Sequence, residues 1–373
     1  MPWKEVSAVN LRTEFVAMAS LPDANISLLC QRFQISRKTA YKWLNRAVNG
    51  EVMCDRSRKP LCSPNKTLSS IEDVILDARR LHPEWGGRKL KRHLENMGIA
   101  GLPAASTITE ILRRNALLNT SSAPKQPNWQ RFEHPHPNDL WQMDFKGPID
   151  TKAGKAFALT VLDDHSRFSL GIQVTHGTTF EETKEHLSNV FQRYGLPYRM
   201  TMDNGSPWGN PFGKWSRFTL WLLDHDIKVS HSRPYHPQTQ GKDERFHRTL
   251  KEELLKRSSF ETQGELQRAC DEWRHIYNHI RPHTALNLDS PASHYQLSKR
   301  KFNNEPTAFE YGADYEVRSI QPNGYVNYRG QCYKVAEVFR KLRVGIRPTL
   351  IVDQFEIYYR HQKIGELKLK GKL

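Results

Sequence analysis

The sequence predicts a multidomain protein with α-helical units at the N-terminus, an α/β core on a mixed sheet, and a small C-terminal β-barrel. Its 373 residues are enough for two to four domains at the usual ~100–200 residues per domain. Apolar residues recur at helical spacing in the first third of the chain, and strand-like alternation begins at Leu140. Short strands separated by turn residues then dominate the C-terminal segment. These three patterns predict the fold class.

The same changes divide the chain into six segments. We expect a helical unit in 1–50, a linker in 51–68, a second helical unit in 69–118, a linker in 119–138, the α/β core in 139–300 and the β-barrel in 314–373. The second linker is the clearer one, because it holds four prolines and few apolar residues.

Charge is concentrated at the two flanks of the chain. The net charge of +16 divides into +9 over 1–125, +1 over 126–311 and +6 over 312–373. Basic flanks around a near-neutral centre indicate a polyanionic partner, above all nucleic acid. No stretch approaches the ~18 apolar residues of a membrane span. Five scattered cysteines favour a reducing compartment over a disulfide scaffold, so we expect a cytoplasmic protein without a membrane partner.

The first helical unit has the pattern of a helix-turn-helix. Ser36 is a good N-cap for a helix over Arg37–Asn45. Its inward positions are expected to be Ile35, Ala40, Trp43 and Leu44. Its exposed first turns then carry the candidate DNA contacts Arg37, Lys38, Thr39 and Lys42. Polar and basic groups there suit entry into a major groove, although a small bundle with a solvated basic face would have a similar pattern.

The second helical unit is also basic. We expect helices over Ile71–Leu81, Arg88–Asn96 and Thr107–Leu117, with serine caps at Ser69–Ser70 and Ser106. The candidate DNA contacts are Arg88, Lys89, Arg113 and Arg114. A second helix-turn-helix is the preferred interpretation, and a helical spacer that only positions the first unit is the alternative.

In the core, three consecutive strands precede alternating helices and strands, which predicts a mixed sheet covered on both faces. The expected strands are Leu140–Phe145, Ala156–Leu162, Phe168–Val174, Tyr198–Met202 and Ile227–Ser230, and the expected helices are Thr179–Tyr194, Trp215–Leu223, Thr239–Arg257 and Gln263–Asn278. In the barrel, Asn323-Gly324 predicts a hairpin between Glu316–Ile320 and Tyr325–Tyr328, and Leu350–Asp353 is expected as a strand.

Three acidic residues stand out by their position. Asp144 lies in the first core strand, opposite to the face shared by Trp141 and Met143. Asp203 directly follows a strand, and a carboxylate there lies at the sheet rim where ligands bind. Glu244 lies on the helix after a glycine-containing loop. Each alone could be an ordinary surface or turn residue, but together they point to a site.

The helix that carries Glu244 has two different faces. Glu244, Arg248 and Lys251 fall on one side of the helical wheel, and Phe246, Leu250 and Leu254 on the other. One face therefore goes to the core, and the other presents a carboxylate beside two cations. Three converging carboxylates are the hard oxygen ligands that Mg²⁺ prefers, and a pair of such ions can catalyse in-line phosphoryl displacement.

Three runs of the sequence resemble the DDE catalytic core of retroviral-integrase-type transposases, and most of all bacterial insertion-sequence transposases. They are Trp141-Gln-Met-Asp144-Phe, Met202-Asp203-Asn-Gly-Ser206, and His236-Pro-Gln-Thr-Gln-Gly-Lys-Asp-Glu244-Arg-Phe-His-Arg-Thr-Leu-Lys251. Arg281-Pro-His-Thr-Ala-Leu286 resembles the segment that follows the core in that family. The interval between Asp203 and Glu244 is longer than in the family, and we expect the extra residues in Ser206–Ser216.

The resemblance implies an RNase H-like core in which Asp144, Asp203 and Glu244 are the catalytic residues and hold two Mg²⁺ ions, with Mn²⁺ able to substitute. It implies that Gln240, Arg248 and Lys251 contact the DNA end. The implied function is a transposase that binds terminal inverted repeats, cleaves the transposon ends and joins the 3′-OH to target DNA. Its partners would be the double-stranded DNA of the ends and the target, and a second copy of itself, in at least a dimer.

Two other functions remain open from the sequence. One is a sequence-specific DNA-binding regulator that descends from a transposase and is catalytically inactive. The other is an RNase H-like nuclease acting on RNA–DNA hybrids, which would leave the helix-turn-helix units unexplained.

Overall fold

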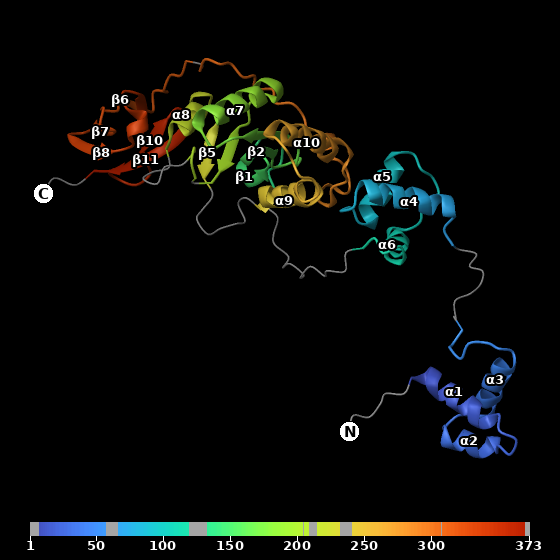
Figure 1. Ribbon diagram of the computed structural model, residues 1–373. Coiled ribbons are helices and arrows are strands. Elements are labelled where there is room, and N and C mark those ends of the chain that lie inside the picture. Colours follow the sequence, from blue (N-terminus) through green and yellow to red (C-terminus); the bar gives the residue numbers. More distant parts are fainter. Residues whose placement is uncertain are drawn as a thin grey trace. The chain divides into compact units, whose positions relative to one another are not determined.

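A computed structural model describes residues 7–56, 66–118, 133–203, 205–208, 215–231, 241–306 and 308–369 (Figure 1). The chain separates into two compact units, Met1–Lys66 and Thr67–Leu373. Within the described residues, no helix is both long and apolar enough to cross a membrane.

The first unit is a cluster of three short helices: α1 (Ala8–Ala19), α2 (Ile26–Arg32) and α3 (Arg37–Val48). Phe15, Cys30 and Ala40 are its buried centre. The Ser36 side chain accepts a hydrogen bond from the backbone N–H of Thr39, so the predicted N-cap of α3 is confirmed. DNA binding by this unit stays a prediction.

The second unit begins with another three-helix cluster, α4 (Ser69–Leu81), α5 (Gly87–Asn96) and α6 (Ala105–Arg114). Trp85 and Leu90 lie in its buried core, onto which the partly buried Ile276 and Ile280 of the later chain also pack. The predicted serine caps are wrong, because α4 and α6 each begin two residues earlier than predicted, after Leu68 and Ala104, without a side-chain cap. Packing of an apolar face stabilises these helices sufficiently without caps.

The core contains a five-stranded mixed sheet in the order β3-β2-β1-β4-β5. Its strands are β1 (Trp141–Thr151), β2 (Gly154–Asp163), β3 (Ser169–Thr175), β4 (Arg199–Met202) and β5 (Lys228–His231). The first three strands pair antiparallel, whereas β4 pairs parallel with both β1 and β5. The predicted mixed sheet is confirmed, with β1 longer than expected.

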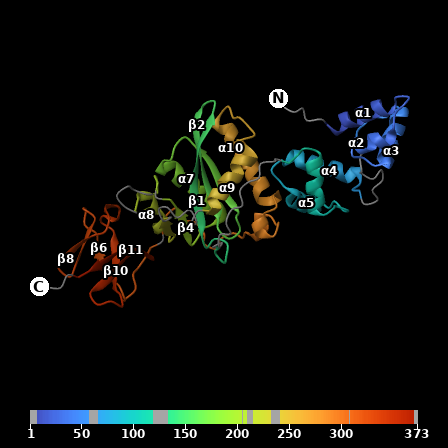
Figure 2. The ribbon, with the colours of Figure 1, turned by 90° about the horizontal axis from the view of Figure 1, so that it is seen from below.

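Helices cover both faces of this sheet (Figure 2). They are α7 (Phe180–Tyr194) and α8 (Arg217–Asp224) on one face, and α9 (Gly241–Leu250) and α10 (Gln263–His275) on the other. Trp141 and Met143 are fully buried in the first hydrophobic layer. Phe246 and Leu250 lie in the second, opposite layer, so the predicted apolar side of α9 is confirmed.

Two helices of the core change their hydrogen-bond spacing near their ends. α9 continues as the π-helix η2 (Lys251–Leu255), and α10 continues as the π-helix η3 (Ile276–Ile280). The segment that follows η3 contains two 3₁₀ turns, η4 (Thr284–Leu286) and η5 (Pro291–His294). π-Helical turns of this kind are often found at functional sites.

Side chains from α10 and η3 cap the exposed edge of β3. The side chain of Asn278 accepts from the backbone N–H of Ser169 at 2.8 Å and donates to its carbonyl oxygen at 2.9 Å. Gln267 does the same for Val174 N–H and Ile172 C=O. A strand edge that is satisfied in this way offers no template for pairing with another chain.

We expect Asn278→Ala to lower the free energy of unfolding by about 2–3 kcal/mol, because the buried N–H and C=O of Ser169 lose their amide partner. Asn278 is 2% exposed, so water cannot replace the lost contacts. The measurement is urea unfolding of the full chain. Arg268→Ala, at an exposed position of the same α10, should change stability by less than about 0.5 kcal/mol. Equal effects of the two variants would contradict this account of the edge.

The C-terminal segment is built of β-strands, as predicted, apart from the short 3₁₀ helix η6 (Glu337–Phe339), but its pairing differs from the prediction. Its strands are β6 (Glu316–Ser319), β7 (Tyr325–Tyr328), β8 (Gln331–Lys334), β9 (Arg343–Pro348), β10 (Gln354–Tyr359) and β11 (Gln362–Lys368). They form a four-stranded sheet, β11-β10-β9-β6, and a separate hairpin, β7-β8. The described strands therefore make two sheets, and their hydrogen bonds do not close the predicted barrel.

Two local predictions in this segment are wrong. A turn does form at Asn323-Gly324, where Gly324 has φ +80°, but β6 then pairs with β9 and β7 with β8. Leu350–Asp353 is a turn, because the Thr349 hydroxyl bonds both to Ile351 N–H and to the Gln354 carbonyl oxygen. An apolar run alone therefore does not make a strand where a threonine can close a local turn.

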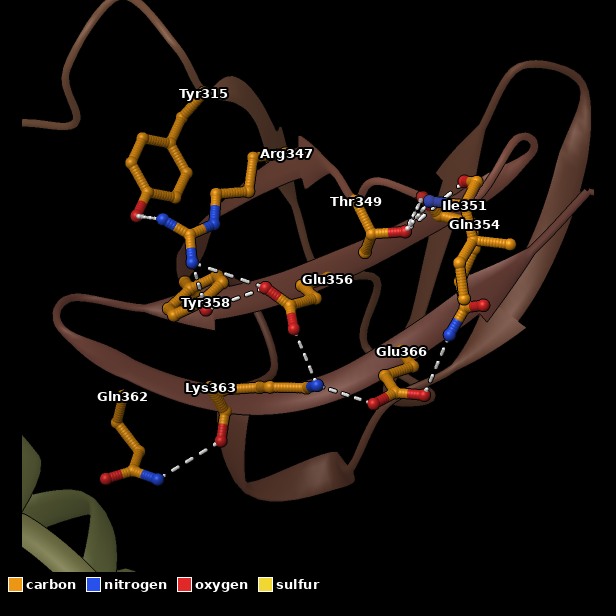
Figure 3. A network of polar contacts seen from close by, with 10 residues as sticks. All are labelled: Tyr315, Arg347, Thr349, Ile351, Gln354, Glu356, Tyr358, Gln362, Lys363 and Glu366. Atoms are coloured by element: carbon orange, nitrogen blue, oxygen red, sulfur yellow. Dashed lines mark hydrogen bonds and ion pairs between the residues drawn. The ribbon is translucent and has the colours of Figure 1, made fainter.

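A polar network covers the surface of the larger C-terminal sheet (Figure 3). Glu356 accepts hydrogen bonds from Lys363 at 2.7 Å and from Arg347 at 3.3 Å. Lys363 also donates a hydrogen bond to Glu366 at 2.5 Å. Hydrogen bonds from Lys363 and Tyr358 lower the pKa of Glu356 to about 2. Two cations of this basic segment are thus neutralised internally on this face.

Candidate active site

Two neighbouring strands bring the first two predicted acids together. β1 and β4 pair in parallel with Gln142 opposite Thr201. Asp144 in β1 and Asp203, directly after β4, each lie two residues further along the chain, so this register brings them near each other where β4 ends. β1 places Asp144 on the face opposite to Trp141 and Met143, as the alternation of the sequence predicts.

The surroundings of Asp144 oppose its ionisation. Burial, together with the negative charges of Asp203 and Glu244, raises its pKa from 3.8 to about 6, although the Phe145 N–H donor and Lys146 act in the opposite direction. The Phe145 N–H lies 2.8 Å from Asp144 Oδ1. A carboxylate crowded by two others is a place where a cation is electrostatically favoured.

Asp203 is oriented by residues that follow it in the chain. Its Oδ1 accepts hydrogen bonds from the backbone N–H of Gly205 and from the indole Nε1 of Trp208. Trp208 is buried and stacks on Phe145, with ring centroids 5.0 Å apart. Trp208 therefore packs in the core. Its hydrogen bond to Asp203 was not predicted.

α9 presents the third acid and two candidate DNA contacts on its solvent side. Glu244, Arg248 and Lys251 are all exposed, which confirms the predicted orientation of this face. The start of α9 is anchored by Lys242, whose Nζ lies 2.5 Å from the buried carboxylate of Asp164. Gln240, the remaining predicted contact here, lies outside the described residues.

Sequence reasoning missed two groups that surround Asp144. Nδ1 of His247 lies 3.6 Å from Oδ2 of Asp144, and Nε2 of His247 lies 2.8 Å from the Thr160 hydroxyl. Burial lowers the pKa of His247 to about 4, so the ring is neutral. Asp243 is fully buried beside the site, and its burial and the charge of Asp144 raise its pKa well above the usual value. A polar side chain on the buried face of α9 was the only available signal for either group.

The donor set fits a divalent metal in its chemistry, because Asp144, Asp203 and Glu244 offer the oxygen ligands that Mg²⁺ prefers. Burial, and then the negative charges of Asp203 and Glu244, raise the pKa of Asp144. Among the residues that the structure describes, no group of three His, Cys, Asp or Glu side chains is gathered tightly enough to hold a metal ion. The acids are neighbours rather than a closed metal cage.

The predicted DNA contacts of the first unit lie at the start of α3. Arg37, Lys38 and Lys42 are exposed there, and Thr39 is half-buried with its hydroxyl 2.9 Å from that of Ser36. Ala40 and Trp43 point inward. Three of the four residues thus present a polar surface as the pattern predicted.

The predicted contacts of the second helical cluster are less uniform. Arg88 is exposed. Lys89 is half-buried, and burial together with Arg281 lowers its pKa to about 8. Arg113 and Arg114 form ion pairs with Glu110 and Glu72, respectively. Only Arg88 among these four is both exposed and without an ion pair in the described part of the chain.

Models of known families match the core and the C-terminal segment of the chain. Two models described as "Integrase core domain" match residues 134–237 and 225–291. A third, described as "IS481 family transposase, C-terminal domain", matches residues 315–372. The chain is thus similar to integrase cores over 134–291 and to the C-terminal domain of IS481 family transposases over 315–372. The predicted resemblance to bacterial insertion-sequence transposases is therefore confirmed.

Two of the relatives come from insertion elements. The chain is 30% identical over 156 residues to an uncharacterized 39.2 kDa protein of insertion element IS476 from Xanthomonas euvesicatoria, which covers 42% of this chain and 44% of the relative. It is 25% identical over 174 residues to an uncharacterized 31.7 kDa protein of IS407 from Burkholderia multivorans, which covers 47% and 61%. Both matches span less than two thirds of the relative's length.

A similar solved structure is the HTLV-2 integrase catalytic core domain in complex with magnesium. It is 17% identical, covers 43% of this chain and 99% of its own, and has a TM-score of 0.34.

Proposed function

We propose that this protein is a DNA transposase that binds the terminal inverted repeats of its element, cleaves the transposon ends and joins the freed 3′-OH to target DNA. The observation that carries the proposal is the juxtaposition of Asp144 and Asp203 on β1 and β4, with the charge of Glu244 acting on Asp144. This occurs inside the stretch that matches the integrase core. Bringing two ends together implies at least a dimer, acting on DNA in the bacterial cytoplasm.

Each part of the site has a role in this reaction. Asp144, Asp203 and Glu244 would hold two divalent ions, Mg²⁺ with Mn²⁺ able to substitute. Bound there, such ions activate the attacking oxygen and neutralise charge on the leaving oxygen. Trp208 keeps Asp203 oriented. Arg248 and Lys251, exposed beside Glu244, and Gln240 would bind the phosphates of the DNA end and hold the scissile bond in place.

The proposal is tested with purified full-length protein, labelled duplexes that carry the ends of its own element, a supercoiled target plasmid and Mg²⁺. Joined product that requires both the cognate ends and the metal is the expected result. Duplexes of unrelated sequence and a chelator are the controls. Tight, salt-sensitive binding of the ends without any product would favour the inactive regulator, and cleavage of an RNA–DNA hybrid without joining would favour the nuclease.

We expect Arg37→Ala to weaken binding of the end duplex and to reduce the slope of log K against log salt by about 1, because one phosphate contact is lost. Arg37 is exposed at the start of α3, so the substitution should leave the fold intact. Fluorescence anisotropy at several salt concentrations measures both quantities. Arg268→Ala removes the same charge from α10 and should leave the slope unchanged. An unchanged slope in Arg37→Ala would exclude Arg37 from the DNA interface.

A further inference from the structure

A hydrogen-bond chain behind Asp144 fixes the proton on the ring of His247. The Thr160 hydroxyl lies 3.0 Å from the carbonyl oxygen of Asp144, to which it donates, and 2.8 Å from His247 Nε2. A hydroxyl has only one proton to give. Since that proton goes to the carbonyl oxygen, Thr160 must accept from His247, and Nε2 therefore carries the ring proton.

The other ring nitrogen is then a bare acceptor that faces a carboxylate. A neutral imidazole carries one proton, so Nδ1 of His247 has a free lone pair. It lies 3.6 Å from Oδ2 of Asp144, and two acceptors at this separation have no hydrogen between them. Both groups are sheltered, with side-chain exposures of 10% and 27%. Either a proton on Asp144 or a metal cation between the two atoms would satisfy this pair, and a metal cation does so with Asp144 ionised.

The separation of the two atoms matches one metal type better than another. Two ligands about 2.0–2.2 Å from one ion in a tetrahedral arrangement lie about 3.4 Å apart. In the octahedral shell of Mg²⁺, with ligands at about 2.1 Å, neighbouring ligands lie about 3.0 Å apart. The observed 3.6 Å is nearer to the tetrahedral value, and imidazole is a ligand that suits Zn²⁺ better than Mg²⁺.

We propose that His247 Nδ1 is a further metal ligand beside Asp144, and that Thr160 holds His247 in the tautomer that can bind a metal. This ligand gives the site affinity for metals that bind imidazole nitrogen well, such as Zn²⁺. The inference rests on the proposed function, because it adds a ligand to the metal site assigned there. Thr160 acts as a positioning residue and His247 as the ligand. Such a second residue behind a metal-bound histidine usually fixes its tautomer and ring orientation.

The test measures metal binding to the full chain without DNA. Zn²⁺ alone and Mg²⁺ alone are titrated by calorimetry, and the ring nitrogens are followed in ¹⁵N-histidine spectra, with the His247 signals assigned from their loss in His247→Gln. We expect Zn²⁺ to shift Nδ1 of His247. We expect His247→Gln to weaken this Zn²⁺ site at least about tenfold and to change Mg²⁺ affinity by less than about twofold.

Two further variants make the outcomes distinguishable. Thr160→Val removes the group that fixes the tautomer and should also weaken Zn²⁺ binding, whereas His186→Gln, a buried histidine on α7 outside the site, should not. The ligand role of His247 would be overturned if His247→Gln bound Zn²⁺ as tightly as the wild type and if Zn²⁺ did not shift the Nδ1 signal of the wild type. Both results would leave the proposed function intact. If Asp144→Asn also bound Zn²⁺ and Mg²⁺ as the wild type does, the metal would not bind at Asp144. That result would contradict the metal site on which the proposed function depends.

Discussion

Asp144→Asn is expected to reduce joining of transposon ends to target DNA by at least about a thousandfold. A metal-stabilised transition state is worth several kcal/mol, and each 1.36 kcal/mol is a factor of ten in rate. Asparagine retains the shape of the side chain and an acceptor for the Phe145 N–H, but it removes the charge that a divalent ion requires. The assay is the same joining reaction, with wild-type and variant protein at equal occupancy of the ends.

Binding of the end duplex should change little in this variant, because α3, Arg248 and Lys251 are untouched. This separates lost chemistry from lost DNA binding. Asp163→Asn is unsuitable as a control, because the buried Asp163 carboxylate accepts hydrogen bonds from Ser166 and Asn138. Asp150→Asn, at an exposed position further along β1, is the matched control and should retain full activity. Joining by Asp144→Asn at the wild-type rate would exclude Asp144 as a metal ligand.

The same substitution should stabilise the metal-free protein at neutral pH. The folded-state pKa of Asp144, about 6, is above the 3.8 of an unperturbed carboxyl. The folded state therefore binds this proton more tightly, and that contribution to stability is complete below pH 3.8 and is lost as the pH rises through 6. At pH 7.5, Asp144→Asn should raise the free energy of unfolding by about 1–2 kcal/mol, less than the full shift because the exposed part of the side chain is screened.

The difference between the two proteins is the measured quantity, because buried histidines give the wild type an opposite pH dependence below pH 6.5. Thermal unfolding in a chelator at pH 5 and pH 7.5 should show a gain for the variant that is larger at the higher pH. A gain that is equal at pH 5 and pH 7.5 would mean that burial and the neighbouring charges do not raise the pKa of Asp144 in the folded protein.

Short-range patterns predicted much of this structure. The alternation in Trp141–Phe145 correctly placed Asp144 opposite to Trp141 and Met143, because successive side chains of a strand point to opposite faces of the sheet. The helical spacing of Phe246 and Leu250 correctly predicted that Glu244 would face solvent. Both predictions need only the spacing of side chains within one helix or one strand, and that spacing can be read from the local sequence.

Features that depend on distant partners were not predictable in this way. Trp208 reaches Asp203, and His247 reaches Thr160, only after the sheet and α9 have packed together. In the C-terminal segment, the turn at Asn323-Gly324 formed, yet β6 pairs with β9. Turn residues fix the local reversal of the chain, whereas the choice of partner strand depends on burial across the sheet.

Breaking the buried ion pair between Glu253 and Arg281 is the second large effect that we expect. Glu253 Oε1 lies 2.8 Å from Arg281 Nε, and both side chains are only 9% exposed. Oε2 of Glu253 also accepts from the indole of Trp273 at 3.3 Å. Glu253→Ala would leave the guanidinium of Arg281 buried without its partner, which typically costs about 3–5 kcal/mol. Urea unfolding followed by tryptophan fluorescence measures this loss.

The neighbouring residue provides a matched control. Glu252 pairs with Lys256 at 2.6 Å, but the two side chains are 40% and 53% exposed, so Glu252→Ala should cost less than about 1 kcal/mol. The double replacement of Glu253 by Leu and Arg281 by Met should be milder than Glu253→Ala, because no buried charge remains. A double replacement as damaging as the single one would place the cost in packing rather than in charge.

This pair also connects stability to the proposed DNA contacts. Glu253 lies within η2, the π-helical turn that begins at Lys251, and Arg281 directly follows η3. The ion pair therefore fixes the turn that carries Lys251 against the end of the following helix. We expect Glu253→Ala to weaken binding of the end duplex as well, and the double replacement to restore part of it. Binding lost equally in both would mean that the charge of Glu253 itself, and not the position of η2, matters for DNA.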